Sequence, residues 1–97
     1  MDDKQILDLY WERSEAAISE TSKKYGKYCR YIASNILHND EDSEECVNDT
    51  YFAVWNAIPN ERPNRFSAFI SRITRNLALK NMNTFLRQKE ILLQLPL

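Results

Sequence analysis

Apolar residues recur at spacings of three and four along most of this chain, and this spacing is the period of an amphipathic helix. A helix turns by about 100° per residue, so such residues share one buried face. The pattern predicts four helices separated by short polar connections. They are expected over about residues 3–13, 14–37, 42–57 and 65–89, with the fourth helix reaching at least Lys80.

The second predicted helix, over residues 14–37, begins at a candidate N-cap. Ser14 is a plausible N-cap, and the acidic Glu15 behind it suits the positive end of the helix dipole. Gly26 falls in the middle and costs about 1 kcal/mol relative to alanine, so a break there is allowed. The buried face is expected to carry Ile18, Thr21, Tyr25, Cys29, Ile32, Ala33 and Ile36.

Polar residues and prolines separate the later helices. Asn39, Asp40 and Asp42 are all competent N-caps for the third helix. Pro59 and Pro63 lie four residues apart and disrupt any helix, so residues 58–64 are predicted to form a loop. The apolar stripe of the third helix comprises Val47, Thr50, Tyr51, Val54 and Ile58, and that of the fourth comprises Phe66, Phe69, Ile70, Ile73 and Leu77.

Composition supports one all-α domain, a compact bundle of about four helices. The 97 residues include a single glycine and three prolines, whereas a β-protein of this size needs many tight turns. Cys29, Cys46 and the single His38 lack the spacing of a zinc site. We therefore expect two reduced, packed thiols in a cytoplasmic protein, with no metal and no cofactor.

Several classes of function are disfavoured. No apolar run approaches the ~20 residues of a membrane span, and the first residues do not resemble a signal peptide. There is no glycine-rich phosphate loop and no Ser/His/Asp set. The acids among residues 40–45 follow a cap and lack a candidate nucleophile or base partner, so they are interpreted as capping and surface charge. We therefore expect a protein that is not an enzyme.

Charge is distributed unevenly although the net charge is only −1. Residues 1–55 hold six Lys and Arg against twelve Asp and Glu, whereas residues 56–97 hold seven against two. This asymmetry suggests two surfaces with different partners, the basic one being a candidate for nucleic acid. Chance sorting of charges into halves is the alternative.

The polar face of the third helix contains a large aromatic residue. Glu45, Asn48, Asp49 and Phe52 fall together, opposite the apolar stripe. An aromatic residue among acids resembles a protein-binding patch. Phe52 packing on another helix, or standing as a lone exposed apolar residue, is an equally good interpretation from the sequence.

The fourth helix carries a flank suited to nucleic acid. Arginine binds phosphates and base edges, and asparagine pairs with base edges. An ordinary solvated flank is the alternative, and it is slightly favoured when this helix is considered alone. A proline-bounded loop with polar side chains could hold a flipped base. The flank consists of Arg65, Arg72, Asn76 and Asn83, with Arg75 further round and with Asn60, Arg62 and Asn64 in the preceding loop.

Two segments resemble a known family. Residues 42–55, DSEECVNDTYFAVW, are similar to the sigma-factor signature D-A-E-D-L-V-Q-E-T-F-L-x-x-W, and residues 65–78, RFSAFISRITRNLA, resemble F-R-A-W-L-x-R-I-A-R-N-L-A. Residues 25–37 are similar to the helix that precedes them in the family. Each motif is degenerate, but the two in order at the right spacing are specific. The chain resembles region 2 of a bacterial RNA polymerase sigma factor of the sigma-70 family, extracytoplasmic-function type.

The resemblance implies partners for both faces. It places Glu45, Asn48, Asp49 and Phe52 against the β′ clamp helices of the RNA polymerase core. It also implies capture of the melted, single-stranded −10 element of promoter DNA, with an anti-sigma factor as a further possible partner. The DNA-binding residues would be Arg72, Arg75, Asn76 and Lys80, with Asn60, Arg62, Asn64 and Arg65 from the loop.

The chain also departs from the family pattern. Glu45 and Asn48 replace the usual Asp and Gln, and residues 81–86 are uncharged where the family has an Arg/Lys cluster. Residues 1–97 are expected to form the region 2 domain alone, because they are too few to hold the second domain that reads the −35 element. Alternatively, the chain is a helical protein-interaction module that binds polymerase or an anti-sigma factor without reading DNA.

Overall fold

Four helices make up the fold in the computed structural model, which describes the backbone of residues 1–94 and the side chains of residues 1–82. No strand occurs in residues 1–94. The prediction of an all-α bundle of four helices is confirmed. The helices are α1 (Asp3–Trp11), α2 (Ala16–Leu37), α3 (Asp40–Ala57) and α4 (Phe66–Gln94).

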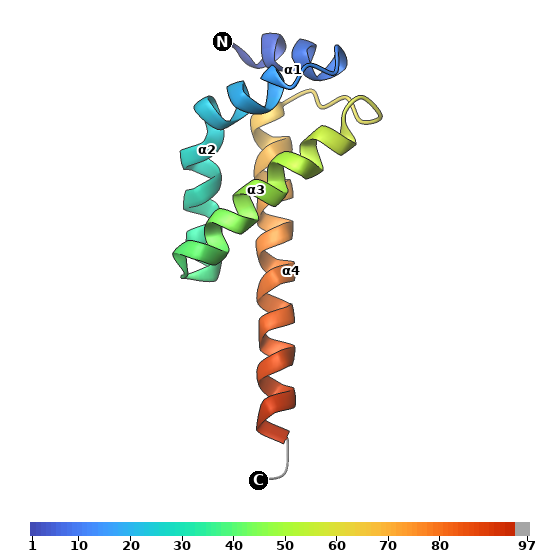
Figure 1. The fold of residues 1–97 in the computed structure, drawn as a ribbon. Coiled ribbons are helices and arrows are strands. Elements are labelled where there is room, and N and C mark those ends of the chain that lie inside the picture. Colours follow the sequence, from blue (N-terminus) through green and yellow to red (C-terminus); the bar gives the residue numbers. More distant parts are fainter. Residues whose placement is uncertain (95–97) are drawn as a thin grey trace.

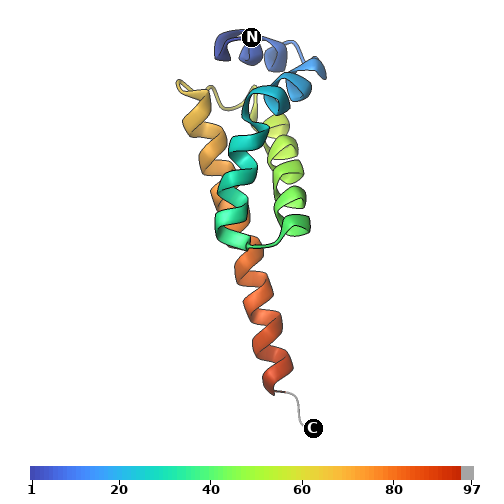
Figure 2. The ribbon, with the colours of Figure 1, turned by 90° about the vertical axis from the view of Figure 1, so that its left-hand side faces the viewer.

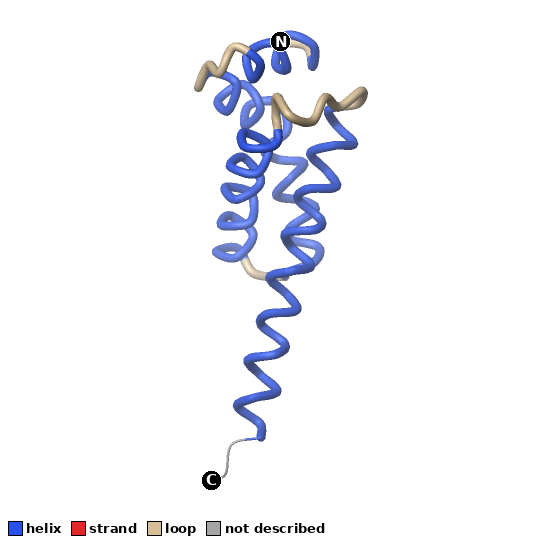
Figure 3. Tube along the Cα trace, turned by 90° about the vertical axis from the view of Figure 1, so that its right-hand side faces the viewer, coloured by secondary structure: helices blue, strands red, loops and turns tan. Residues whose placement is uncertain are grey.

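Three of the helices form a bundle, and the fourth closes one end of it. α2, α3 and α4 pack against one another, and α1 lies across the end where α2 and α4 begin and α3 finishes (Figures 1 and 2). α4 extends well beyond its neighbours, so the molecule measures 57 × 24 × 21 Å. The 58–65 loop and the turn after α1 therefore lie at the same end of the molecule (Figure 3).

Side-chain caps fix where α1 and α3 begin. Asp2 accepts a hydrogen bond from the Gln5 amide while the Gln5 side chain accepts one from the Asp2 amide, which is a capping box. Asn39 accepts from the amide of Asp42 at 2.9 Å, so α3 begins two residues earlier than predicted. α1 ends earlier than predicted because Arg13 adopts a left-handed backbone with φ 58°.

Two expectations about α2 change. Ser14 is not the N-cap: the helix begins at Ala16, and Glu15 occupies the cap position without a side-chain bond. The tight turn after α1 displaces the start, and the Ser14 hydroxyl accepts a 3.3 Å bond from the amide of Ala16. Gly26 causes no break. A Cβ there would lie 3.1 Å from the Tyr51 hydroxyl, so glycine lets α2 and α3 approach closely.

The predicted apolar stripes form the core, with a rotation in α4. Phe66, Phe69 and Ile70 are buried as expected, and so are Val47, Thr50, Val54 and Ile58 of the α3 stripe. Ile73 and Leu77 are only partly buried, because α4 turns Thr74 and Ala78 inward instead. Thr74 was missed because its hydroxyl marks it as polar in the sequence.

Buried hydroxyls pair with one another across the core. The Tyr10 and Thr21 hydroxyls lie 2.6 Å apart, which ties α1 to α2. Thr50 and Thr74 join α3 to α4 at 3.2 Å, and each also bonds the carbonyl four residues before it. These bonds satisfy polar groups that would otherwise be costly to bury.

An exposed ionic contact fastens the start of α1 to α2. Asp3 accepts hydrogen bonds from the Lys24 ammonium at 2.7 Å and from the Tyr25 hydroxyl at 2.6 Å. Partial burial alone would raise the pKa of Asp3, but these two bonds and the Lys24 charge outweigh it and lower the pKa below 3.8. Burial, followed by the bond to Asp3, raises the pKa of Tyr25.

The Asp3 contact predicts a pH dependence of stability. A lowered carboxyl pKa means that its stabilisation is complete above 3.8 and is lost as the pH falls through the lowered value. Denaturant unfolding of wild type and Asp3→Asn, followed from pH ~7 to pH ~2, measures this. We expect the wild-type advantage to be constant at neutral pH and to shrink in acid. An advantage that grew in acid would contradict the assignment.

Candidate functional site

The polar face of α3 is exposed as predicted. Glu45, Asn48 and Asp49 are exposed, and 67% of the Phe52 surface is accessible. The interpretation in which Phe52 packs on another helix therefore fails for the part of the chain whose side chains are described. Exposing a phenylalanine ring to water is unfavourable. The ring and its polar neighbours form what we call the α3 face: Glu45, Asn48, Asp49 and Phe52.

A groove between α2 and α3 borders the α3 face. Glu44, Asn48 and Tyr51 line one wall, and Lys27 and Arg30 line the other. The groove thus combines carboxylate, amide and cationic groups beside the exposed ring. Neither Lys27 nor Arg30 was predicted from the sequence to belong to a site. The signal that would have placed them was Gly26, because its close approach to Tyr51 brings this part of α2 against α3.

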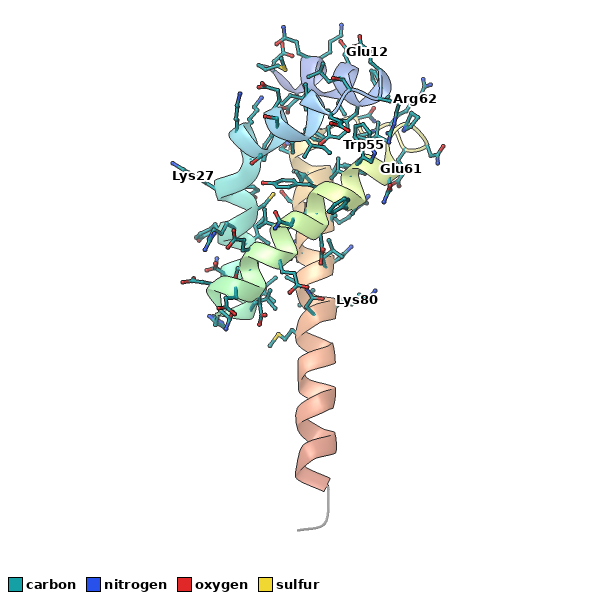
Figure 4. All side chains as sticks on the ribbon, in the orientation of Figure 1. Glu12, Lys27, Trp55, Glu61, Arg62 and Lys80 are labelled. Carbon is teal, nitrogen blue, oxygen red and sulfur yellow. The ribbon has the colours of Figure 1, made fainter. Side chains whose placement is uncertain are left out.

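The basic side of α4 is also exposed. Arg72, Arg75 and Asn76 lie on adjacent turns, and Lys80 follows Asn76 by one further turn. Residues 66–82 contain no acid. Figure 4 shows Lys80 far along α4 from the loop that carries Arg62. The predicted DNA-binding residues therefore form a long strip rather than one pocket, and the side chain of Asn83 lies outside the described residues.

The loop residues lie at the end of the bundle beside α1. Asn60, Arg62, Asn64 and Arg65 are all exposed. The Arg62 guanidinium lies over the Trp11 ring, 6.0 Å from its centroid. Figure 4 shows Arg62 at the same end of the bundle as Glu12, Trp55 and Glu61. The structure brings α1 into the surroundings of the predicted loop, which sequence spacing did not indicate.

The cysteines belong to the core rather than to either exposed face. Cys29 and Cys46 are buried free thiols. Burial, together with Asp49 and Cys29, raises the pKa of Cys46 to about 11, so the thiol stays protonated at neutral pH. Among residues 1–82, no three His, Cys, Asp or Glu side chains are grouped to hold a metal ion. None of the helices searched in that same part is long and apolar enough to cross a membrane.

The comparisons with known proteins identify the family. The model of the sigma-70 region 2 family matches residues 22–89, which cover most of α2, all of α3 and most of α4. The curated proteins and the solved structures gave no significant match. Region 2 is a non-enzymatic domain of transcription initiation whose partners are RNA polymerase and promoter DNA. Because the match covers more than half of its length, this chain belongs to the sigma-70 region 2 family.

Proposed function

We propose that residues 1–97 form the region 2 domain of an extracytoplasmic-function type sigma factor. In this role the α3 face binds the β′ clamp helices of the polymerase core, and α4 with its preceding loop captures the melted non-template strand of the −10 element. The type assignment rests on the motif resemblance of residues 42–55 and 65–78. Promoter binding places the protein in the cytoplasm.

The exposed ring of Phe52 is the observation that carries the polymerase-binding part of the proposal. Binding hot spots combine a large aromatic anchor with polar groups that surround it. Phe52 stands 67% exposed, and Glu45, Asn48 and Asp49 lie on the same face. The groove extends this surface with Lys27 and Arg30 of α2. A partner helix bearing both charges and an apolar pocket fits such a surface.

The acid-free stretch of α4 supports the DNA-binding part. Arg72, Arg75 and Lys80 are exposed along residues 66–82, and arginine pairs with phosphates through its planar fork. The asparagines at 60, 64 and 76 offer donors and acceptors to base edges. A single strand is favoured over a duplex because its base edges are open to the side chains on the basic side of α4.

Loss of two arginines is expected to reduce the salt dependence of DNA binding. Each phosphate contact with single-stranded DNA contributes about 0.7 to the slope of log affinity against log salt. The double variant Arg72→Ala/Arg75→Ala should therefore bind single-stranded oligonucleotides with a slope that is less steep by about 1.4. Fluorescence anisotropy over a salt series measures both slopes.

The double variant Lys23→Ala/Lys27→Ala is the matched control, because it removes two exposed cations from α2. Its slope should stay at the wild-type value. Equal losses in both double variants would indicate non-specific attraction only. Absence of DNA binding in the wild type, with polymerase binding retained, would favour a protein-interaction module that binds polymerase or an anti-sigma factor without contacting DNA.

A further inference from the structure

Part of the molecule outside the family match contacts the proposed DNA-binding loop. The family model begins at residue 22, whereas α1 and the turn after it lie before that point. This segment is fastened to the bundle by the Asp3 contacts with Lys24 and Tyr25 and by the Tyr10–Thr21 hydrogen bond. A segment held in this way can present its own side chains in a fixed geometry. Two of them, Trp11 and Arg13, reach the end of α3 and the loop.

Arg13 contacts the junction between the end of α3 and the loop. Its guanidinium donates to the carbonyl of Trp55 at 2.9 Å and to that of Ile58 at 2.5 Å. It also lies 3.7 Å from the centroid of the Trp55 ring. The last turn of α3 has no basic residue of its own, so Arg13 supplies donors to carbonyls that a helix end leaves unpaired.

The backbone of Arg13 sets the direction in which the chain leaves α1. Its φ of 58° lies in the left-handed region, where glycine is preferred and other residues are disfavoured. Arg13 is the C′ residue of a Schellman motif that ends α1, in which its amide donates to the Tyr10 carbonyl and the Ser14 amide donates to the Leu9 carbonyl. The residue that ends α1 is thus also the one whose guanidinium bonds the carbonyls of Trp55 and Ile58 at the start of the loop. The loop therefore leaves α3 from a fixed position toward Trp11.

Trp11 is an exposed aromatic ring beside that loop. It is 41% accessible, and Arg62 of the loop lies over it at 6.0 Å. A π-face next to an arginine plane is the arrangement on which unpaired bases stack. Glu12 and Glu61 are the sequence neighbours of Trp11 and Arg62, and both are exposed. These carboxylates repel phosphate but accept hydrogen bonds from exocyclic amino groups, so the surroundings favour a base over a phosphate.

We propose that Trp11 and Arg62 form a stacking site for an unpaired nucleobase, with Arg13 as the positioning residue that holds the loop beside it. This inference rests on the proposed capture of single-stranded DNA and extends that surface onto α1. The strand would run from the basic side of α4, over the loop, to the Trp11 ring. Trp11 is thus assigned a direct contact with a base, whereas Arg13 acts through the backbone of Trp55 and Ile58.

Tryptophan fluorescence tests the stacking directly. The chain has two tryptophans, so Trp55→Phe leaves Trp11 as the only one and keeps an aromatic ring beneath Arg13. Single-stranded adenine oligonucleotides should quench Trp11, whereas abasic strands of equal length and charge should not. Trp11→Ala should weaken binding of the adenine strand about tenfold, as expected for one lost base–aromatic stack. Trp11→Phe should restore most of that loss, and binding of the abasic strand should not change.

Arg13→Ala tests the positioning role. It should reduce the ratio of adenine-strand to abasic-strand affinity while leaving the salt slope unchanged. Equal quenching by both strands, or wild-type binding of the adenine strand by Trp11→Ala, would overturn the stacking site. If Arg72→Ala/Arg75→Ala still lowers the salt slope in that case, the proposed function stands and only the inference fails. If the wild type binds no single-stranded DNA, both fail.

Discussion

Truncation of Phe66 to alanine is expected to lower the free energy of unfolding by about 3–5 kcal/mol. Phe66 is the first residue of α4, and only 1% of its surface is exposed. Its ring lies 5.9 Å from that of Tyr10 in α1 and 5.6 Å, edge-on, from that of Tyr25 in α2. Removing it leaves a cavity where three helices meet. A domain of this size has a total stability of about 5–15 kcal/mol, so the loss is large.

Urea denaturation followed by circular dichroism measures the loss. Leu79→Ala is the control on the same helix, because Leu79 is exposed, and its effect should stay within about 0.5 kcal/mol. Similar losses of unfolding free energy in the two variants would contradict the assignment of Phe66 to the core. Phe66→Ala should also release α1 from the bundle. The protection of the α1 amides from hydrogen exchange should therefore fall more than that of the α3 amides.

Replacing Phe52 with alanine is expected to weaken binding to core polymerase by about 30-fold or more, since a central aromatic hot spot contributes about 2 kcal/mol or more. The same change should leave stability almost unaltered, because Phe52 is already 67% exposed in the free chain. Titration of labelled chain with core polymerase measures the first effect, and thermal unfolding measures the second.

Tyr31→Ala is the matched control for Phe52→Ala. Tyr31 is an equally exposed aromatic residue, 65% accessible, but it lies on α2. Its removal should change polymerase affinity by less than about threefold, as for most residues outside a hot spot. Retention of wild-type polymerase affinity by Phe52→Ala would contradict the proposal that the α3 face binds polymerase. A large loss of stability would instead indicate that Phe52 supports the fold.

The existence of the four helices was predictable because each has a strong period, whereas several of their ends were not. Asn39 and the prolines at 59 and 63 mark boundaries through local chemistry that a sequence displays directly. Ser14 misled because the turn after α1 depends on the left-handed backbone of Arg13, which no local rule requires of an arginine. The inward rotation of Thr74 was likewise hidden, since its partner Thr50 lies 24 positions away.

The sequence predicted which site residues share a face of one helix, but not which residues of different helices lie together. Helical spacing placed Phe52 with Glu45 and Arg72 with Asn76, because residues on one helix have fixed relations. It could not place Lys27 beside Asn48, since that depends on how closely α2 approaches α3 at Gly26. The meeting of Trp11 with Arg62 depends in the same way on α1 crossing the end of the bundle.

Strand-selective recruitment of DNA to polymerase requires both the α3 face and the basic side of α4, so its measurement tests the two surfaces together. Core polymerase would be titrated into fluorescent single strands selected from a random pool for binding, and into their complements, with and without this chain. We expect the chain to tighten binding of the selected strand but not of its complement, and Phe52→Ala and Arg72→Ala/Arg75→Ala each to abolish the gain. Equal binding of both strands with and without the chain would contradict this expectation.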